Sequence, residues 1–287
     1  VFTENQFSAA ISTAVASLPL VSTAAWRNHP EFKSPLYDER GCVTGVEDNF
    51  NLVLRRYGLE PIQDVWELAN GRSALNLAPV IPELEPRLAE FPNTHYVGAL
   101  LYPGIELGPV PLELSEDRSR RLVYVYMSVG SITPGQYVPE LVKAFAGSPF
   151  QVAAALRLEA FCGQQLPLRM GNVFLYRMLP GMAVARNSAV VITRGGQNTL
   201  VSCILTGTSI IGFPGDGAEA DFIMDGIVRL GVGVKCRPEE FCAPRVREIV
   251  ESVIANPEYR ARTAPAADKI RSFGGAHAAL QLIRKLV

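Results

Sequence analysis

Residues 190–215 read VVITRGGQNTLVSCILTGTSIIGFPG, and this stretch decides the fold. The apolar, β-branched run over Ala189–Thr193 predicts a buried strand, and Ser209–Phe213 predicts a second one. Between them, two glycines precede a helix that we expect over Asn198–Thr206. A buried strand, a helix and another buried strand predict a parallel βαβ unit, in which helices cover both faces of a sheet.

The same alternation extends through the second half of the chain. Further strands are predicted at Leu122–Met127, Phe150–Leu156, Val173–Tyr176 and Gly233–Cys236, and helices at Gln136–Ala146, Glu219–Leu230, Arg245–Ala255 and from His277 onward. The first half reads as part of a second α/β region, with strands at Pro19–Thr23, Ala74–Ala78 and Tyr96–Leu101 and helices at Asn49–Tyr57 and Asp64–Asn70.

These patterns divide the chain. We expect a partial N-terminal Rossmann-like domain over 1–112, followed by a charge-rich linker over 113–120. A second Rossmann-like domain is expected over 121–271, and a final helix over 272–287 is expected to return to the first domain. The chain opens in what reads as the end of a strand, and parallel strands need neighbours. We therefore expect the sequence to lack the natural start of its first domain.

Composition restricts the classes of function. The 287 residues are 48% hydrophobic, which is typical of a globular protein. Their net charge is −1, so the chain has no overall positive charge that would attract nucleic acid. The apolar runs are far shorter than a membrane span. The five scattered cysteines indicate reduced thiols and a cytoplasmic protein. A homodimer is compatible with these patterns, which do not decide the oligomeric state.

One loop that follows a predicted strand combines glycine with a hydroxyl. It reads MSVGSITPGQ over 127–136 and contains Gly130 and Ser131. Gly130 would let a ligand approach the backbone, and Ser131 would supply a hydroxyl and an N–H group. On the residues alone, a tight strand-to-helix turn explains this loop equally well.

A second loop, TRGGQNT over 193–199, leads into the helix of the opening stretch. We expect Asn198 or Thr199 to be the helix N-cap. Helix N-termini attract anions, and Arg194 could add a bidentate contact to a phosphate. A surface arginine beside two turn-forming glycines is the equally open alternative. Neither loop has the Walker A or GxGxxG pattern, which disfavours a nicotinamide dinucleotide.

Together, these motifs resemble a known family. TRGGQNTLVSCILTGTSIIGFP followed by EADFIMDGIVRLGVGV is similar to the donor-binding segment of GT-B glycosyltransferases of the macrolide type, with its HGG, Thr, GxP and LGxG pattern. VGSI at 129–132 fits the family's Gly-Ser turn, MLPG at 178–181 fits its WxP element, and FSAAISTAVASLPLVST in the first half is also similar to it. The resemblance implies an α/β, GT-B fold with two Rossmann-like domains and parallel sheets, the N-terminal one incomplete.

The resemblance also implies a function. A sugar would move with inversion from a nucleoside diphosphate, UDP or dTDP, to a hydroxyl of a small hydrophobic natural-product acceptor, with no other cofactor and no metal. The donor-binding residues implied by the matched motifs are Gly130, Ser131, Met178, Leu179, Arg194, Gly195, Gly196, Gln197, Asn198, Thr199 and Glu219.

This sequence departs from the family pattern at three places. Arg194 replaces the family's His, and a cation there still suits a diphosphate. Met178 replaces the Trp that stacks on the nucleobase. Glu219 and Ala220 replace an Asp-Gln pair that binds sugar hydroxyls, which suggests a sugar with fewer hydroxyls, such as a deoxysugar on dTDP.

The acceptor base is not evident from the sequence. The family carries a His near the start of its N-terminal domain, and His29 is the weak candidate here. If the base lies in a segment outside this sequence, the chain alone binds donor but transfers nothing. Two alternatives stay open: a sugar-nucleotide 2-epimerase and a non-catalytic nucleotide-sugar-binding auxiliary protein.

Overall fold

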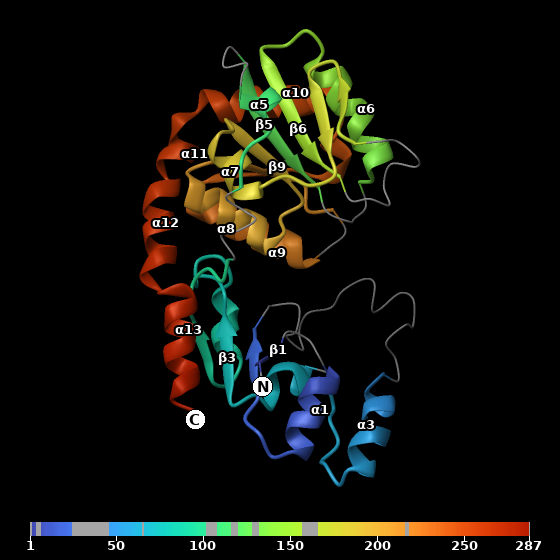
Figure 1. Cartoon of the computed structure of the whole chain (residues 1–287), viewed down its shortest axis with the longest axis vertical. Coiled ribbons are helices and arrows are strands. Elements are labelled where there is room, and N and C mark those ends of the chain that lie inside the picture. Colours follow the sequence, from blue (N-terminus) through green and yellow to red (C-terminus); the bar gives the residue numbers. More distant parts are fainter. Residues whose placement is uncertain are drawn as a thin grey trace. The chain divides into compact units, whose positions relative to one another are not determined.

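The computed structural model describes residues 2–3, 7–24, 46–64, 66–101, 108–115, 120–127, 132–156, 166–215 and 218–286. The chain forms two compact units (Figure 1). Unit 1 contains Val1–Leu100 and Ile270–Val287, and unit 2 contains Leu101–Lys269. Among the described helices, none combines the length and the apolar character needed to cross a membrane.

Unit 1 is built on a parallel sheet. Its described strands follow the order β1 (Phe2–Thr3), β2 (Val21–Thr23), β3 (Leu75–Ala78) and β4 (Thr94–Tyr96). All four residues of β3 are buried, as expected for a central parallel strand with both faces covered.

Apolar layers lie against this sheet. One cluster joins α1 (Phe7–Val15) and α3 (Val46–Arg56) through Ile11 and Leu54. Another cluster joins the strands to α13 (Gly275–Arg284), where Ala279 packs with Leu77. The last helix of the chain is therefore part of unit 1. Other described elements of unit 1 are a π-helical turn, η2 (Glu67–Gly71), and a 3-10 helix, η3 (Pro86–Glu90).

Unit 2 contains the larger sheet. Its strand order is β11 (Gly233–Lys235), β10 (Ser209–Gly212), β9 (Val190–Thr193), β5 (Arg121–Tyr126), β6 (Phe150–Ala155), β8 (Val173–Tyr176) and β7 (Leu168–Met170). Every pairing is parallel except that of β7 with β8, which is antiparallel.

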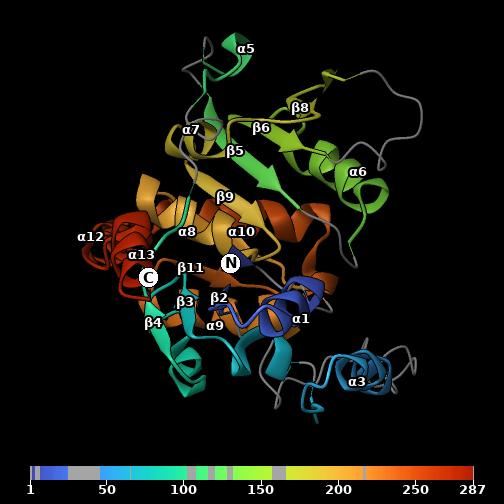
Figure 2. The same ribbon diagram turned by 60° about the horizontal axis from the view of Figure 1, so that its bottom comes forward.

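Helices cover both faces of the unit 2 sheet. The helices α6 (Pro134–Phe145) and α10 (Ala243–Ala255) pack together on the largest apolar cluster. The helices α7 (Gly181–Arg186), α8 (Gln197–Thr206) and α9 (Ala218–Leu230) follow one another in contact. Figures 1 and 2 show α6 and α7 on opposite sides of β5 and β6.

Shorter elements complete unit 2. They are α5 (Leu112–Ser115), η5 (Pro238–Glu240) and α11 (Pro257–Ala261). Helix α12 (Thr263–Ser272) spans the boundary between the two units.

The fold class expected from the sequence is confirmed, one predicted strand is misplaced, and two short elements were not predicted. The strand expected over Tyr96–Leu101 lies earlier, because Gly98 has a φ of +72° and ends the extended run after β4. The linker contains a helical turn, α5. The antiparallel strand β7 was not predicted, since three residues carry too little periodicity to be recognised.

Candidate functional site

The unit 2 sheet has a topological switch point between two neighbouring strands. Strand β5 pairs with β9, with Tyr126 opposite Thr193 at their carboxyl ends. From β5 the chain continues to β6 on one side, and from β9 it continues to β10 on the other. In doubly wound sheets, ligands bind at the carboxyl edge where strand order reverses in this way. The two glycine-containing loops of the sequence leave the sheet at this place.

The turn after β9 is held from inside the protein. Gly195 is buried and has a φ of +99°, a conformation that L side chains rarely adopt. Its N–H group donates to Thr193 Oγ1 at 3.3 Å. A Cβ on Gly195 would lie 2.9 Å from Met224 Cγ and 3.2 Å from the Ala220 carbonyl oxygen. Gly195 therefore shapes the turn, and its amide already has an acceptor.

The N-terminus of α8 is presented by this turn. The sequence-based expectation of Asn198 or Thr199 as N-cap is wrong, since Gly196 is the N-cap and no side chain caps the helix. The helix begins one residue earlier than expected because Gly196 adopts an extended conformation, with φ −60° and ψ 129°, directly after the turn. Helix geometry leaves the first-turn N–H groups of α8 without an intrahelical acceptor.

The surface around that helix end is open and polar. Gly196 and Asn198 are exposed, and Gln197 and Thr199 are half-buried. A Cβ on Gly196 would meet no atom within 4 Å. The later part of α8 is anchored in the core by five consecutive buried residues from Leu200 to Ile204. A fixed helix end with a positive partial charge and open space before it suits an anion.

Arg194 lies between two loops of the carboxyl edge. Its guanidinium Nη2 donates to the Pro214 carbonyl oxygen at 3.2 Å, in the loop that follows β10. The side chain is half-buried. This contact positions the cation beside the turn of Gly195, and a guanidinium has five N–H donors with which to make further contacts.

A second cation near this edge is already neutralised. Lys235, the last residue of β11, has its Nζ 2.7 Å from Asp221 Oδ1 and 2.8 Å from Asp225 Oδ1 of α9. Burial opposes the charged amine, but hydrogen bonds and charges from both aspartates outweigh it and raise the pKa of Lys235. Lys235 therefore braces α9 against β11.

Met178 and Leu179 follow β8 and have opposite environments. Met178 is 71% exposed, and Leu179 is buried at 7%. An apolar side chain that is so exposed beside the carboxyl edge offers a flat contact for an aromatic base, whereas Leu179 belongs to the protein interior.

Several predicted site residues cannot be placed. Gly130, Ser131 and His29 lie outside the described residues. Glu219 belongs to the first turn of α9, and its side chain is also outside the described set. The structure thus brings together Arg194 and residues 195–199 at the carboxyl edge.

Two supporting residues escaped sequence reasoning. Thr193 Oγ1 accepts from the turn, and Met224 fills the space behind Gly195. A threonine two residues before a glycine is a detectable signal for such a turn. Met224 lies 29 residues away on another helix and carries no such signal.

Comparison with known proteins shows which sequences and folds this chain is similar to. No protein-family profile matches the chain. It is 27% identical over 289 aligned residues to a PGL/p-HBAD biosynthesis rhamnosyltransferase of Mycobacterium bovis (strain BCG / Pasteur 1173P2). That match covers 92% of this chain and 62% of the relative. The chain therefore spans less than two thirds of the length of this relative.

Solved structures give the fold. The calicheamicin glycosyltransferase CalG4 superimposes with a TM-score of 0.74 at 20% identity, over 100% of this chain and 74% of that protein. The spinosyn rhamnosyltransferase SpnG, complexed with thymidine diphosphate, gives a TM-score of 0.70 at 15% identity, over 99% of this chain and 72% of that protein. The resemblance to GT-B glycosyltransferases drawn from the sequence motifs is confirmed, and the fold is that of GT-B enzymes.

Proposed function

We propose that this chain binds a nucleoside diphosphate sugar at the carboxyl edge of the unit 2 sheet and takes part in transfer of the sugar to an acceptor hydroxyl. The observation that carries the proposal is the uncapped N-terminus of α8 at the switch point of a GT-B sheet, with Arg194 beside it. Similarity to named glycosyltransferases supports the reaction class.

The proposed donor site divides into parts. The diphosphate contacts the N–H groups at the start of α8, the Thr199 hydroxyl and Arg194. Gly130 and Ser131, from the loop after β5, supply further contacts to the same diphosphate. The base lies against Met178, with Leu179 behind it. Glu219 accepts a hydrogen bond from the sugar. UDP and dTDP both satisfy these contacts as co-substrates, and no metal or further cofactor is required.

The reaction is a substitution at the anomeric carbon. The acceptor oxygen forms a bond to that carbon from the face opposite the diphosphate, the carbon–oxygen bond to the β-phosphate breaks, and a base takes the acceptor proton. Negative charge grows on the leaving phosphate, where preorganised donors contribute most to catalysis. Arg194 and the first-turn amides of α8 fill this role. For the base, His29 stays the candidate from the sequence.

The names of the relatives refine the donor and acceptor. A rhamnosyltransferase among the relatives and SpnG, also a rhamnosyltransferase, favour a dTDP-deoxysugar as donor. This agrees with the replacement of an Asp-Gln pair by Glu219 and Ala220. We infer that the acceptor is a hydrophobic natural product or glycolipid.

Calorimetric titration of the full protein with dTDP and with UDP tests the proposal. We expect binding, and we expect Arg194→Ala to weaken it by about tenfold or more, because charge-assisted contacts to phosphate contribute about 1.5–3 kcal/mol. Arg284→Ala, on α13, removes the same charge far from this turn in the sequence and serves as control. Equal affinities in all three proteins, or no binding of either nucleotide, would reject the donor site.

A further inference from the structure

The unit 2 sheet has a second hollow at its opposite edge. A pocket of about 980 Å³ lies at the amino ends of the parallel strands, where Arg121 begins β5, Ala189 precedes β9 and Ser209 begins β10. The strands are four to six residues long, so about 13–20 Å separates this edge from the carboxyl edge of the proposed donor site. The two sites therefore share no residue.

Arginine dominates the charge of this pocket. Four of the lining residues are Arg120, Arg121, Arg186 and Arg260, and no acidic residue is among the described lining residues. The described lining residues thus carry a formal charge of +4 in a chain whose net charge is −1. Like charges gathered in one hollow repel one another, although Arg121, Arg186 and Arg260 are exposed and water and salt screen part of this repulsion.

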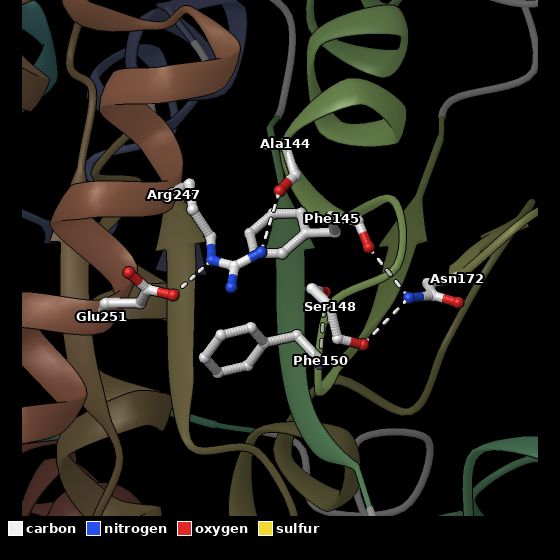
Figure 3. A network of polar contacts seen from close by, with 7 residues as sticks. All are labelled: Ala144, Phe145, Ser148, Phe150, Asn172, Arg247 and Glu251. Atoms are coloured by element: carbon white, nitrogen blue, oxygen red, sulfur yellow. Dashed lines mark hydrogen bonds and ion pairs between the residues drawn. The ribbon is translucent and has the colours of Figure 1, made fainter.

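Other arginines near this edge are compensated within the protein. Figure 3 shows Arg247, whose Nε lies 2.5 Å from Glu251 Oε1 and whose Nη1 donates to the Ala144 carbonyl at 3.2 Å. Its guanidinium also lies over the Phe150 ring at 5.3 Å. Arg247 is therefore a structural arginine of the α6–α10 packing.

Arg120 is held in place by the same network. It donates to Asn172 Oδ1, and Asn172 Nδ2 donates in turn to the carbonyl oxygens of Phe145 at 2.8 Å and Ser148 at 3.2 Å (Figure 3). The turn between α6 and β6 thus fixes the orientation of one guanidinium on the pocket wall.

The remaining pocket arginines have no such compensation. Within the described part of the chain, the guanidinium groups of Arg121, Arg186 and Arg260 make no hydrogen bond or ion pair. Two described carboxylates that adjoin lining residues in the sequence have other partners. Glu113 accepts a hydrogen bond from the Tyr176 hydroxyl at 2.8 Å. Glu258 lies 3.7 Å from Arg262.

The side chains of the pocket are suited to phosphate. Guanidinium groups bind phosphate bidentately, and Asn187, Ser188 and Asn256 add polar groups to the wall. The volume is at the upper end of the range for small-ligand pockets. We propose that this pocket is a second anion site that binds a phosphorylated ligand, independent of the sugar-nucleotide site. The phosphoryl group belongs either to a free metabolite or to a lipid headgroup.

Titration of the full protein with inorganic pyrophosphate tests the free ligand. We expect the paired substitution Arg121→Gln with Arg186→Gln to weaken pyrophosphate binding by about tenfold or more. Arg284→Gln should leave the affinity unchanged. Because pyrophosphate also suits the proposed donor site, Arg194→Ala is measured alongside. If only Arg194→Ala weakens pyrophosphate binding and the pair also leaves vesicle binding unchanged, the pocket proposal is overturned; if the pair weakens pyrophosphate binding and Arg194→Ala does not, the pocket stands even where the donor site fails.

Cosedimentation with phosphatidylglycerol and phosphatidylcholine vesicles tests the headgroup. Binding to the anionic vesicles alone, lost in the paired variant, assigns the phosphoryl group to a lipid. No effect of the pair on either pyrophosphate or vesicle binding overturns the proposal.

Thermal unfolding separates a ligand site from a structural role. If Arg186 only compensates the carboxyl end of α7, it stabilises the fold, and its removal in the paired variant would lower the Tm. Arginines kept for a ligand repel one another, so we expect the ligand-free paired variant to melt at or above the Tm of the native protein. A lowered Tm together with unchanged pyrophosphate and vesicle binding overturns the proposal.

Discussion

Gly195→Ala is expected to damage the turn that presents α8. The backbone φ of +99° costs a non-glycine residue about 1–3 kcal/mol. The new Cβ would also lie 2.9 Å from Met224 Cγ, which can move, and 3.2 Å from the Ala220 carbonyl oxygen, which belongs to the backbone of α9. The turn cannot relax freely, because α8 is anchored by its buried residues.

The consequence is measurable in two assays. A loss of about 1–3 kcal/mol lowers the Tm of a protein of this size by about 3–10 °C. Displacement of the α8 N-terminus should weaken dTDP binding by about tenfold or more, since at least one charge-assisted hydrogen bond is lost. Circular dichroism during heating gives the first value and calorimetry gives the second.

Gly196→Ala provides the matched control. Gly196 has an ordinary φ of −60°, and its Cβ would meet no protein atom within 4 Å. We expect its Tm to fall by only about 1–4 °C, because alanine at an N-cap is about 0.5–1 kcal/mol less favourable than glycine and no backbone strain or close contact is added. If Gly195→Ala melts no lower than Gly196→Ala, the argument from the backbone angle and the Met224 contact is refuted.

Two further substitutions, one in each unit, test contributions to stability. The Glu140 carboxylate accepts hydrogen bonds from Lys143 and from the Ala243 N–H at the start of α10, both of which hold its pKa below the ordinary 4.5. A lowered folded-state pKa stabilises the protein above pH 4.5, and this contribution is lost as pH falls through the folded pKa. Glu140→Gln should therefore lower the Tm at pH 7, and the difference in Tm between the variant and the native protein should shrink in acid. A difference in Tm that stays constant across pH would contradict this. In unit 1, the fully buried Asn76 exchanges hydrogen bonds with Asn70 at 2.8 and 2.9 Å. Asn76→Ala should cost about 1–3 kcal/mol in urea unfolding, because the remaining polar groups lose their partners; a loss below about 0.5 kcal/mol would contradict it.

The sequence predicted the architecture because it is encoded locally, and the candidate donor site is likewise drawn from one contiguous stretch. The buried strands β9 and β10 and the glycines between them are contiguous, and their period and composition specify a βαβ unit. The N-cap was misplaced because Asn198 and Thr199 have stronger cap propensity than Gly196. At this position the backbone geometry of the turn, rather than side-chain capping, determines where α8 begins.

Features formed by distant segments could not be predicted. The arginine pocket combines residues from Val110 to Ala261, and only the strand order brings them to one edge. Met224 behind Gly195 is likewise a consequence of helix packing. For such contacts a single sequence has no signal, because each residue is unremarkable among its own neighbours.

Determination of a crystal structure of the full protein with dTDP bound is the most direct test of the donor site. We predict phosphate oxygens within about 3.1 Å of backbone N–H groups at residues 196–199, with the Arg194 guanidinium in contact with the same diphosphate. A diphosphate bound at any other place on the chain, with the N-terminus of α8 facing only solvent or protein, would contradict the account.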